Sequence, residues 1–461
     1  MLLKEKLMKK LLLIALILFA IGTKVFADDT PMQNKPLDFK EAIVVALECN
    51  QELMGMKEAL AASEKDIGIS RSNLIPKIRV GEDFVTTNNP AQVFALKLNK
   101  TRLSSADFAG APGTFNSPGN ITNFLTYGLI EIPVFNKPSL VALKMAKVQY
   151  SANSYVYMRK QEELIKNVAQ NYLQIGTAQE YIKVAQQGLK EANEHLRIAN
   201  VRYKSELGLY SDVLRAKTEV SEAEQRLVTA NKNLSVSKRA LGFLLGTKQS
   251  IEISNVTPIL DLKAVDYYKS YMPQRSDLRA LEINVDNAKN GVRLAQADWF
   301  PTLNLNASYN LYNNSYPFGA EGNNYIAGAF LHWDAFDGMK RNYETGKAKN
   351  KVKEAGFYLE SLKNAIDFKV FEAFACVQEA NKNYELAQIA LTSAEEGNRL
   401  VTKRWQASLS PFVDVLDSQT NLDRARANLV KSNNDLKAQL ITLYFESGVL
   451  KQELALETTN K

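Results

Sequence analysis

The strongest constraint on the fold is that the chain repeats itself. Residues 37–248 can be laid over residues 262–450 at nearly constant offsets. Pro76 aligns with Pro301 at an offset of 225 residues, Phe135 with Phe336 at 201, and Arg202 with Arg404 at 202. Self-similarity over such long units indicates a duplicated structural unit. We therefore expect a fold made of two similar halves.

Each unit is predicted to contain a helix, two strands and two long helices. Pro76 and Pro301 should end the first helices, because proline lacks a backbone donor and disfavours helical geometry in the residue before it. The first unit carries about 24 more residues between Pro76 and Phe135 than its counterpart, in a Gly/Pro/Asn-rich stretch that includes residues 88–90 and 111–113. That composition predicts a loop. Residues 246–272 lack clear periodicity and are predicted to connect the two units.

The strand pair of the second unit shows the clearest alternation. Between Thr302 and Tyr312, apolar residues alternate with Asn and Ser, and the partner strand carries its apolar residues from Tyr325 to Trp333. A half-buried hairpin of a water-soluble protein gives the same pattern. Two features favour membrane strands: the first strand has the length of a tilted membrane strand, and aromatic residues gather toward the strand ends, as at bilayer interfaces. These aromatic residues are Trp299, Phe300, Tyr312, Tyr316, Phe318 and Trp333.

Very long helices follow the strands in each unit. Residues Lys137 to Lys204 and Lys340 to Ala407 contain no proline after Pro138, and 68 helical residues span roughly 100 Å. Their return helices repeat apolar residues every seven positions, which predicts helices that supercoil around neighbours. A wall of helices around a lumen and an ordinary antiparallel coiled coil both fit this pattern. The repeated residues are Val213, Val220, Leu227, Leu234 and Leu241 in the first unit, and Val415, Leu422, Leu429, Leu436 and Leu443 in the second.

The N-terminus predicts export. Four lysines precede the apolar stretch from Leu11 to Thr23, and Val25-Phe26-Ala27 follows it, so residues 1–27 are predicted to be a signal peptide. Residues 28–461 would form one domain of two repeats, with no transmembrane helix. Cys49 and Cys376 lie too far from the cleavage site for lipid attachment there. We expect both to be buried thiols, and a disulfide between them is the less favoured alternative. The leader accounts for +4 of the formal charge of +7, and the remaining +3 gives no basis for nucleic-acid binding.

Catalytic motifs are lacking in the sequence. The two histidines, His195 and His332, show no metal-ligand spacing, and no nucleophile motif or phosphate-binding glycine loop is present. We therefore expect no enzymatic activity, no metal site and no cofactor. A soluble periplasmic coiled-coil adaptor or scaffold protein is the alternative class, since it would explain export, duplication and heptads, although it would not need two amphipathic hairpins with aromatic ends.

Four strands cannot close into a barrel, and open strand edges are too costly in a membrane, so membrane strands would require several copies of the chain. The order of the elements and the junctions between them resemble the TolC family of outer membrane factors. The resemblance rests on residues 73–76 and 298–301, on residues 275–278 and on residues 412–417. It implies a homotrimer with a shared twelve-strand barrel in the cell outer membrane, and a helical tunnel that meets a periplasmic adaptor and an inner-membrane pump.

Two positions depart from the family pattern. Ser276 stands where the family usually has proline in Arg-Pro-Asp-Leu. Ser410 stands where a gate arginine would lie five residues after an aromatic, here Trp405. The family's latch is therefore absent from this chain or is built differently.

The resemblance places the candidate functional residues at the periplasmic tip. Asp414 and Asp417 lie three residues apart at the start of a helix, and we expect a cation-preferring filter there, whereas stabilisation of the helix dipole is the plainer explanation and fits Asp212 of the first unit equally well. Leu207 and Leu409 occupy matched turn positions, where they would contact an adaptor or would staple the helices together. The sequence does not identify the cargo, the pump or the adaptor.

Overall fold

A computed structural model describes residues 36–109, 113–254 and 260–456 of the chain. The predicted signal peptide and residues 111–112 of the predicted loop lie outside the described residues. The first unit consists of helices α2 (Phe39–Cys49) and α3 (Gln51–Ser72), strands β1 (Lys77–Thr87) and β2 (Ile121–Phe135), and helices α7 (Lys137–Lys204) and α8 (Tyr210–Leu244). The second unit consists of α10 (Ser276–Ala297), β3 (Thr302–Asn313), β4 (Gly322–His332), α11 (Lys340–Gln406) and α12 (Phe412–Ser447).

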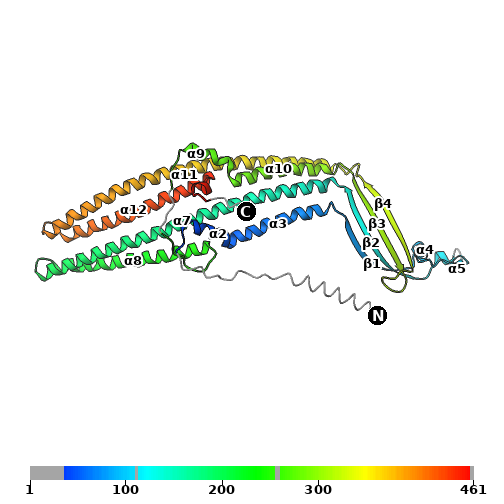
Figure 1. The fold of residues 1–461 in the computed structure, drawn as a ribbon, viewed down its shortest axis with the longest axis horizontal. Helices are drawn as coiled ribbons and strands as arrows, with labels where there is room; N and C mark the ends of the chain where they lie inside the picture. Colours follow the sequence, from blue (N-terminus) through cyan, green and yellow to red (C-terminus); the bar gives the residue numbers. More distant parts are fainter. Residues whose placement is uncertain (1–35, 110–112, 255–259, 457–461) are drawn as a thin grey trace.

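The duplication also governs strand pairing. The sheet is antiparallel with the order β1-β2-β3-β4, as Figure 1 shows at the end remote from the helical tips. Lys77 pairs with Glu131 in the first hairpin, and Thr302 pairs with His332 in the second. These residues are related by the offsets of 225 and 201, so the two hairpins have the same register. Pairing of β2 with β3 joins the two units.

The two faces of the sheet differ in chemistry and in exposure. Leu305 and Tyr309 lie on the exposed face, together with their cross-strand neighbours Ala329 and Tyr325. The opposite face carries Asn304, Asn306, Ser308 and Asn310, which are half-buried or buried. The predicted alternation is therefore confirmed, and the apolar face is the more exposed one. Tyr312, next to the end of β3, lies on the asparagine face, where its ring is buried and its hydroxyl accepts a hydrogen bond from Asn324 at 3.3 Å.

Two stretches that were predicted to lack regular structure contain helices. The connection from β1 to β2 holds α4 (Pro90–Asn99), α5 (Ser105–Ala109) and α6 (Gly113–Asn116). Asn89 accepts a hydrogen bond from the Gln92 amide and Pro90 occupies the first helical turn, so residues expected to mark a loop start a helix instead. The connector between the units likewise contains α9 (Val265–Tyr271) and the short 3-10 helix η1 (Met272–Gln274).

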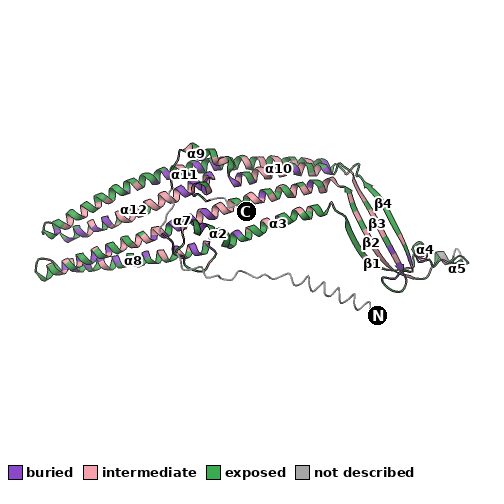
Figure 2. Cartoon of the chain, viewed as in Figure 1, coloured by how far each residue is buried: buried purple, intermediate pink, exposed green. Residues whose placement is uncertain are grey.

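The helices form a layer with α7 at its centre (Figure 1). In the half near the sheet, the lateral order is α3, α7, α10, α11, and in the half that ends at the tips it is α8, α7, α12, α11. Figure 2 shows that exposed residues cover much of α8 and α11, which flank this layer. The lateral edges of the chain are therefore β1, α3 and α8 on one side and β4 and α11 on the other.

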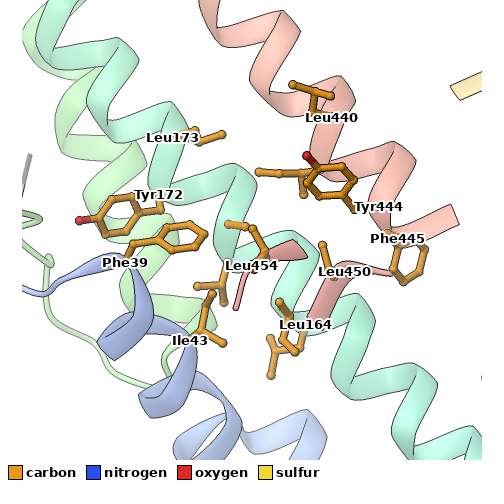
Figure 3. Close-up of a cluster of buried hydrophobic side chains, with 14 of the residues drawn as sticks. Phe39, Ile43, Leu164, Tyr172, Leu173, Leu440, Tyr444, Phe445, Leu450 and Leu454 are labelled. Atoms are coloured by element: carbon orange, nitrogen blue, oxygen red, sulfur yellow. The ribbon is translucent and has the colours of Figure 1, made fainter. Parts of the chain in front are cut away.

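The main apolar core lies midway along the molecule, where α2, α7 and α12 meet (Figure 3). Phe39 packs edge-on against Tyr172, with ring centroids 5.3 Å apart. The Tyr172 hydroxyl donates to the Ser254 carbonyl at 2.6 Å, so the chain between the units is tied to this core. After α12 ends at Gly448, which has φ 86°, the short helix α13 (Leu450–Glu453) folds back onto it. The core therefore holds both units together well away from the sheet and the tips.

Cys49 is exposed and Cys376 is half-buried, and both are free, so the prediction of two buried thiols was wrong, most clearly for Cys49. α10 begins at Ser276, so the helix starts there without the family's proline, and the serine hydroxyl donates to Glu162 at 2.9 Å. Across the described residues, no helix combines the length and the apolar character needed to cross a membrane.

Candidate functional site

The candidate site is the pair of turns at the helical tips, at the end of the molecule opposite the sheet (Figure 1). Residues 205–209 join α7 to α8, and residues 407–411 join α11 to α12. Glu206 has φ 56° and Ser408 has φ 61°, and the two residues are related by the offset of 202. Both turns therefore pass through the left-handed region at the same position, and the duplication extends to local backbone geometry.

A small apolar cluster separate from the main core holds the two turns together. Trp405 and Phe412 are buried, with ring centroids 4.9 Å apart, and α7 and α8 contribute small side chains against them. This tip cluster consists of Ala199, Val213, Ala216, Trp405, Phe412 and Val415. Trp405 therefore belongs to the packing between the two helical hairpins, and its ring is not free to act at a surface.

The Arg202 side chain reaches from the helical hairpin α7–α8 to the helical hairpin α11–α12. Its guanidinium donates to the carbonyl oxygens of Trp405 at 3.1 Å and Gln406 at 3.2 Å, and to the Ser408 hydroxyl at 2.8 Å. The last carbonyls of a helix lack intrahelical partners and carry partial negative charge, so a cation is favoured there. Arg202 thus caps α11 from a neighbouring hairpin. In the sequence, Arg202 aligns with Arg404, and no local signal there marks this contact.

Asp414 and Asp417 are exposed at the start of α12. They lie three residues apart and therefore share one face of the helix, whereas Val415 and Gln419 on the other side are buried. The described residues provide no ion-pair partner for either carboxylate. Asp212, in the first turn of α8, is half-buried, which is compatible with its stabilising the helix dipole.

The remaining predicted tip residues have distinct surroundings. Leu207 and Leu409 are 72% and 70% exposed, so in this chain they do not staple the helices together. The Ser410 hydroxyl is buried and has no hydrogen-bond partner among the described residues. A serine cannot supply the cation of a salt bridge, and Arg202 provides the cross-hairpin contact from the other side.

Further from the turns than the tip cluster, ionic contacts join α7 and α8 to α12. Arg426 makes a forked contact with Glu191 at 2.8 and 3.1 Å, and Arg226 lies 3.4 Å from Asp423. Burial opposes ionisation of Glu191, but the hydrogen bonds and charge of Arg426 outweigh it and hold the pKa of Glu191 below its usual range. The two hairpins are therefore fastened by charged groups as well as by apolar packing.

His195 lies between these ionic contacts and the tip cluster. Its ring meets Phe412 edge-on, with centroids 6.4 Å apart, and its Nδ1 atom is buried with no partner in the described part of the chain. Burial lowers the pKa of His195, although the carboxylates of Glu191, Glu219 and Glu194 act in the opposite direction. The imidazole is therefore neutral at pH 7. Within the described ranges, no three His, Cys, Asp or Glu side chains are grouped as metal ligands.

Comparison with known proteins gives a consistent result. The family described as Outer membrane efflux protein matches residues 42–247 and 268–449, which correspond closely to the two units. Outer membrane protein TolC of Escherichia coli K12 is 22% identical over 98% of this chain and 89% of its own length. Outer membrane protein TolC of Vibrio cholerae is 22% identical over 69% of this chain and 75% of its own length.

Solved structures share the fold. A crystal structure of CusC matches with a TM-score of 0.76 at 16% identity, covering 92% of this chain and 97% of that one. The outer membrane protein VceC from Vibrio cholerae matches with a TM-score of 0.74 at 16% identity, covering 89% and 96%. These matches extend over most of this chain, so it shares its fold with CusC and VceC.

Proposed function

The chain belongs to the outer membrane efflux protein family, and we propose that three copies of it form one duct from the periplasm to the outside. The protein is an outer membrane channel, an exit duct for efflux or secretion that extends into the periplasm. The observation that carries the proposed assembly is the four-stranded sheet, which has an exposed apolar face and two open edges.

The open edges favour closure by copies of the same chain. β1 and β4 run antiparallel to each other because the sheet alternates in direction over four strands. The β4 strand of one copy can therefore pair with β1 of the next in the same sense as the pairs within the chain. Each unpaired backbone group would cost several kcal/mol in lipid, so a closed ring is strongly favoured. Three copies would contribute twelve strands, with the apolar face toward lipid and the asparagine face toward the lumen.

The tips are proposed to meet a periplasmic adaptor that links the duct to an inner-membrane pump. Leu207 and Leu409 point into solvent at matched positions of the two turns, and a trimer would present six such leucines around the tunnel mouth. Exposed leucines on both turns suit the apolar contacts of a helical partner. Cysteine crosslinking from these turns to a copurifying adaptor tests the contact, and labelling of the turns from outside intact cells would contradict the orientation.

Asp414 and Asp417 are proposed to form a cation-preferring filter. Both carboxylates are exposed on the side of α12 away from the buried residues and lack an ion-pair partner among the described residues, which supports a role beyond packing. Threefold assembly would bring six carboxylates together, and such a ring attracts cations. The double change Asp414→Ala and Asp417→Ala should reduce cation preference and block by divalent ions in single-channel recordings. Unchanged selectivity with an intact oligomer would leave stabilisation of the helix dipole as their role.

The alternative, a soluble periplasmic adaptor, is not favoured by any feature of the sheet. An adaptor would have no use for an exposed apolar sheet face with open edges. Extraction distinguishes the two: the duct should remain with the outer membrane until detergent is added, and its detergent-corrected mass should be that of three mature chains. Release without detergent, or a stable monomer in detergent, would contradict the proposal.

A further inference from the structure

Equivalent helices of the two units have unequal surroundings. α7 is flanked by α12, whereas the corresponding flank of α11 faces no other element in the described part of the chain. Ala169 on α7 is fully buried, and Phe371, its counterpart 202 residues later on α11, is 61% exposed. Phe445 on α12 is 8% exposed, and its counterpart Phe243 on α8 is 78% exposed. One flank of α11 and one flank of α8 therefore lack the contact that the equivalent flanks of α7 and α12 make with each other inside the chain.

The internal contact between α7 and α12 is well defined. Near its middle, the Thr177 hydroxyl donates to the Asn434 side-chain oxygen at 2.8 Å. Nearer the sheet, the Phe445 ring lies beneath two cations of α7, with Arg159 3.6 Å and Lys166 4.4 Å from its centroid. These contacts fix how far α12 is shifted along α7, and so define the register between the units.

The duplication predicts an equivalent contact between two copies of the chain, in which each residue is replaced by its counterpart in the other unit. In the second unit, α11 is the counterpart of α7, and α12 is the counterpart of α8. The counterpart of the α7–α12 contact is therefore a contact between α11 of one copy and α8 of another copy. The strands follow the same rule, because pairing of β2 with β3 becomes pairing of β4 with β1 of another copy. The offset of 202 converts Thr177 and Asn434 into Glu379 and Lys232, and it converts Lys166 and Phe445 into Phe368 and Phe243.

We propose that α11 of one copy packs against α8 of the next in the register of α7 against α12. This pairs Glu379 with Lys232 of the adjacent copy, and Phe368 with Phe243 of the adjacent copy. The proposal rests on the proposed function, in which copies of this chain close a ring, and it specifies which residues meet there.

The chemistry of the converted pairs fits a second copy as the occupant. A neutral hydrogen bond within the chain becomes a carboxylate opposite an ammonium, and both Glu379 and Lys232 are exposed without an ionic partner among the described residues. The contact of a cation with a ring becomes a contact between two aromatic rings, which is favourable in its own right. Phe368 is 62% exposed, as expected for a ring that packs against another copy of the chain.

The tip follows the same register. The Arg202 guanidinium donates to the Ser408 hydroxyl within the chain, and the offset converts this pair into Arg404 and Glu206 of the adjacent copy. Arg404 is exposed, and its guanidinium has no partner within the described ranges. A carboxylate in place of the hydroxyl gives a cation a stronger acceptor. These three converted pairs are therefore compatible in charge or in shape, and the fourth contact, of Arg159 with Phe445, becomes Ser361 opposite Phe243 of the adjacent copy.

Crosslinking of the full chain in detergent tests the register. In a background with Cys49→Ser and Cys376→Ser, the pair Lys232→Cys and Glu379→Cys should be joined by a short bismaleimide into dimers and trimers on a denaturing gel. Thr177→Cys with Asn434→Cys is the matched control and should crosslink within one chain, without a change in mass. Lys232→Cys with Glu372→Cys, displaced by two helical turns or about 10 Å, should link far less.

The outcomes separate this proposal from the assembly on which it depends. A stable oligomer in which the control pair links and the 232/379 pair does not would overturn the register and leave the duct intact. A monomeric mass would overturn the assembly itself. A charge exchange gives a second readout: Glu379→Lys should lower the temperature at which the oligomer dissociates, and adding Lys232→Glu should restore it. Failure of the exchange to restore that temperature would count against the ion pair.

Discussion

Arg202 is the residue whose replacement should most selectively loosen the tip. It makes hydrogen bonds from α7 to the Trp405 and Gln406 carbonyls and to the Ser408 hydroxyl, and a longer one to the Leu207 carbonyl at 3.4 Å within its own turn. A hydrogen bond to a charged group contributes about 1.5–3 kcal/mol when it is protected from water. Because Arg202 is half-exposed, we discount the sum to about 2 kcal/mol for the whole side chain.

The change Arg202→Met keeps the length of the side chain and removes its donors. A loss of about 2 kcal/mol corresponds to a roughly 30-fold larger equilibrium constant for local opening. Hydrogen–deuterium exchange measures this directly, because amides near residues 407–416 should exchange faster while those of the main core do not change. Lys204→Met is the matched control, since Lys204 is exposed in the same last turn of α7. Equal exchange in both variants would refute the assignment of Arg202 as a cross-hairpin tie.

Three further predictions concern the contacts above the turns. Glu191→Gln should destabilise the tip at neutral pH by about 2 kcal/mol; the deficit should shrink as the pH falls below the ordinary pKa value of 4.5, because the lowered pKa of Glu191 means that the contribution of its carboxylate is lost in that range. His195 has a lowered pKa, so tip stability should fall as the pH drops below about 6.5, when only the unfolded form readily gains a proton; His195→Phe should remove this dependence in tip exchange measured between pH 7 and pH 5. Trp405→Ala should cost about 3–5 kcal/mol of tip stability, with the main-core amides still protected from exchange.

Much of the fold could be predicted because the signals were periodic and occurred twice. The first long helix was predicted from Lys137 to Lys204 and is observed with those bounds; the second ends at Gln406, one residue earlier than predicted. The repeat offsets reappear as strand register. The helices in the connection from β1 to β2 were missed because Asn-Pro both marks loops and starts helices, and composition alone does not separate these two uses.

The tip was predicted less completely, for a physical reason. The sequence locates Asp414, Asp417, Leu207 and Leu409 near the turns because spacing and helix starts are local features. Arg202 could not be singled out, because Arg404 occupies the same position in the second unit and nothing local distinguishes the two. Only the lateral arrangement of the hairpins decides which arginine finds carbonyls within its own chain. Cross-hairpin contacts depend on tertiary geometry, which heptad patterns do not specify.

The two units differ in sequence mainly at positions that face different surroundings in the folded chain. Positions that face the interior of each hairpin keep similar apolar residues, such as Val168 and Val370, which are buried in both units. Thr177 meets its partner within one folding chain, where a neutral hydrogen bond suffices. Its counterpart Glu379 lies on a flank that is exposed before any partner arrives, and a flank that was apolar throughout would promote unselective association. In the proposed assembly, Phe243 and Phe368 would supply contact area, and the charges of Glu379 and Lys232 would select the register.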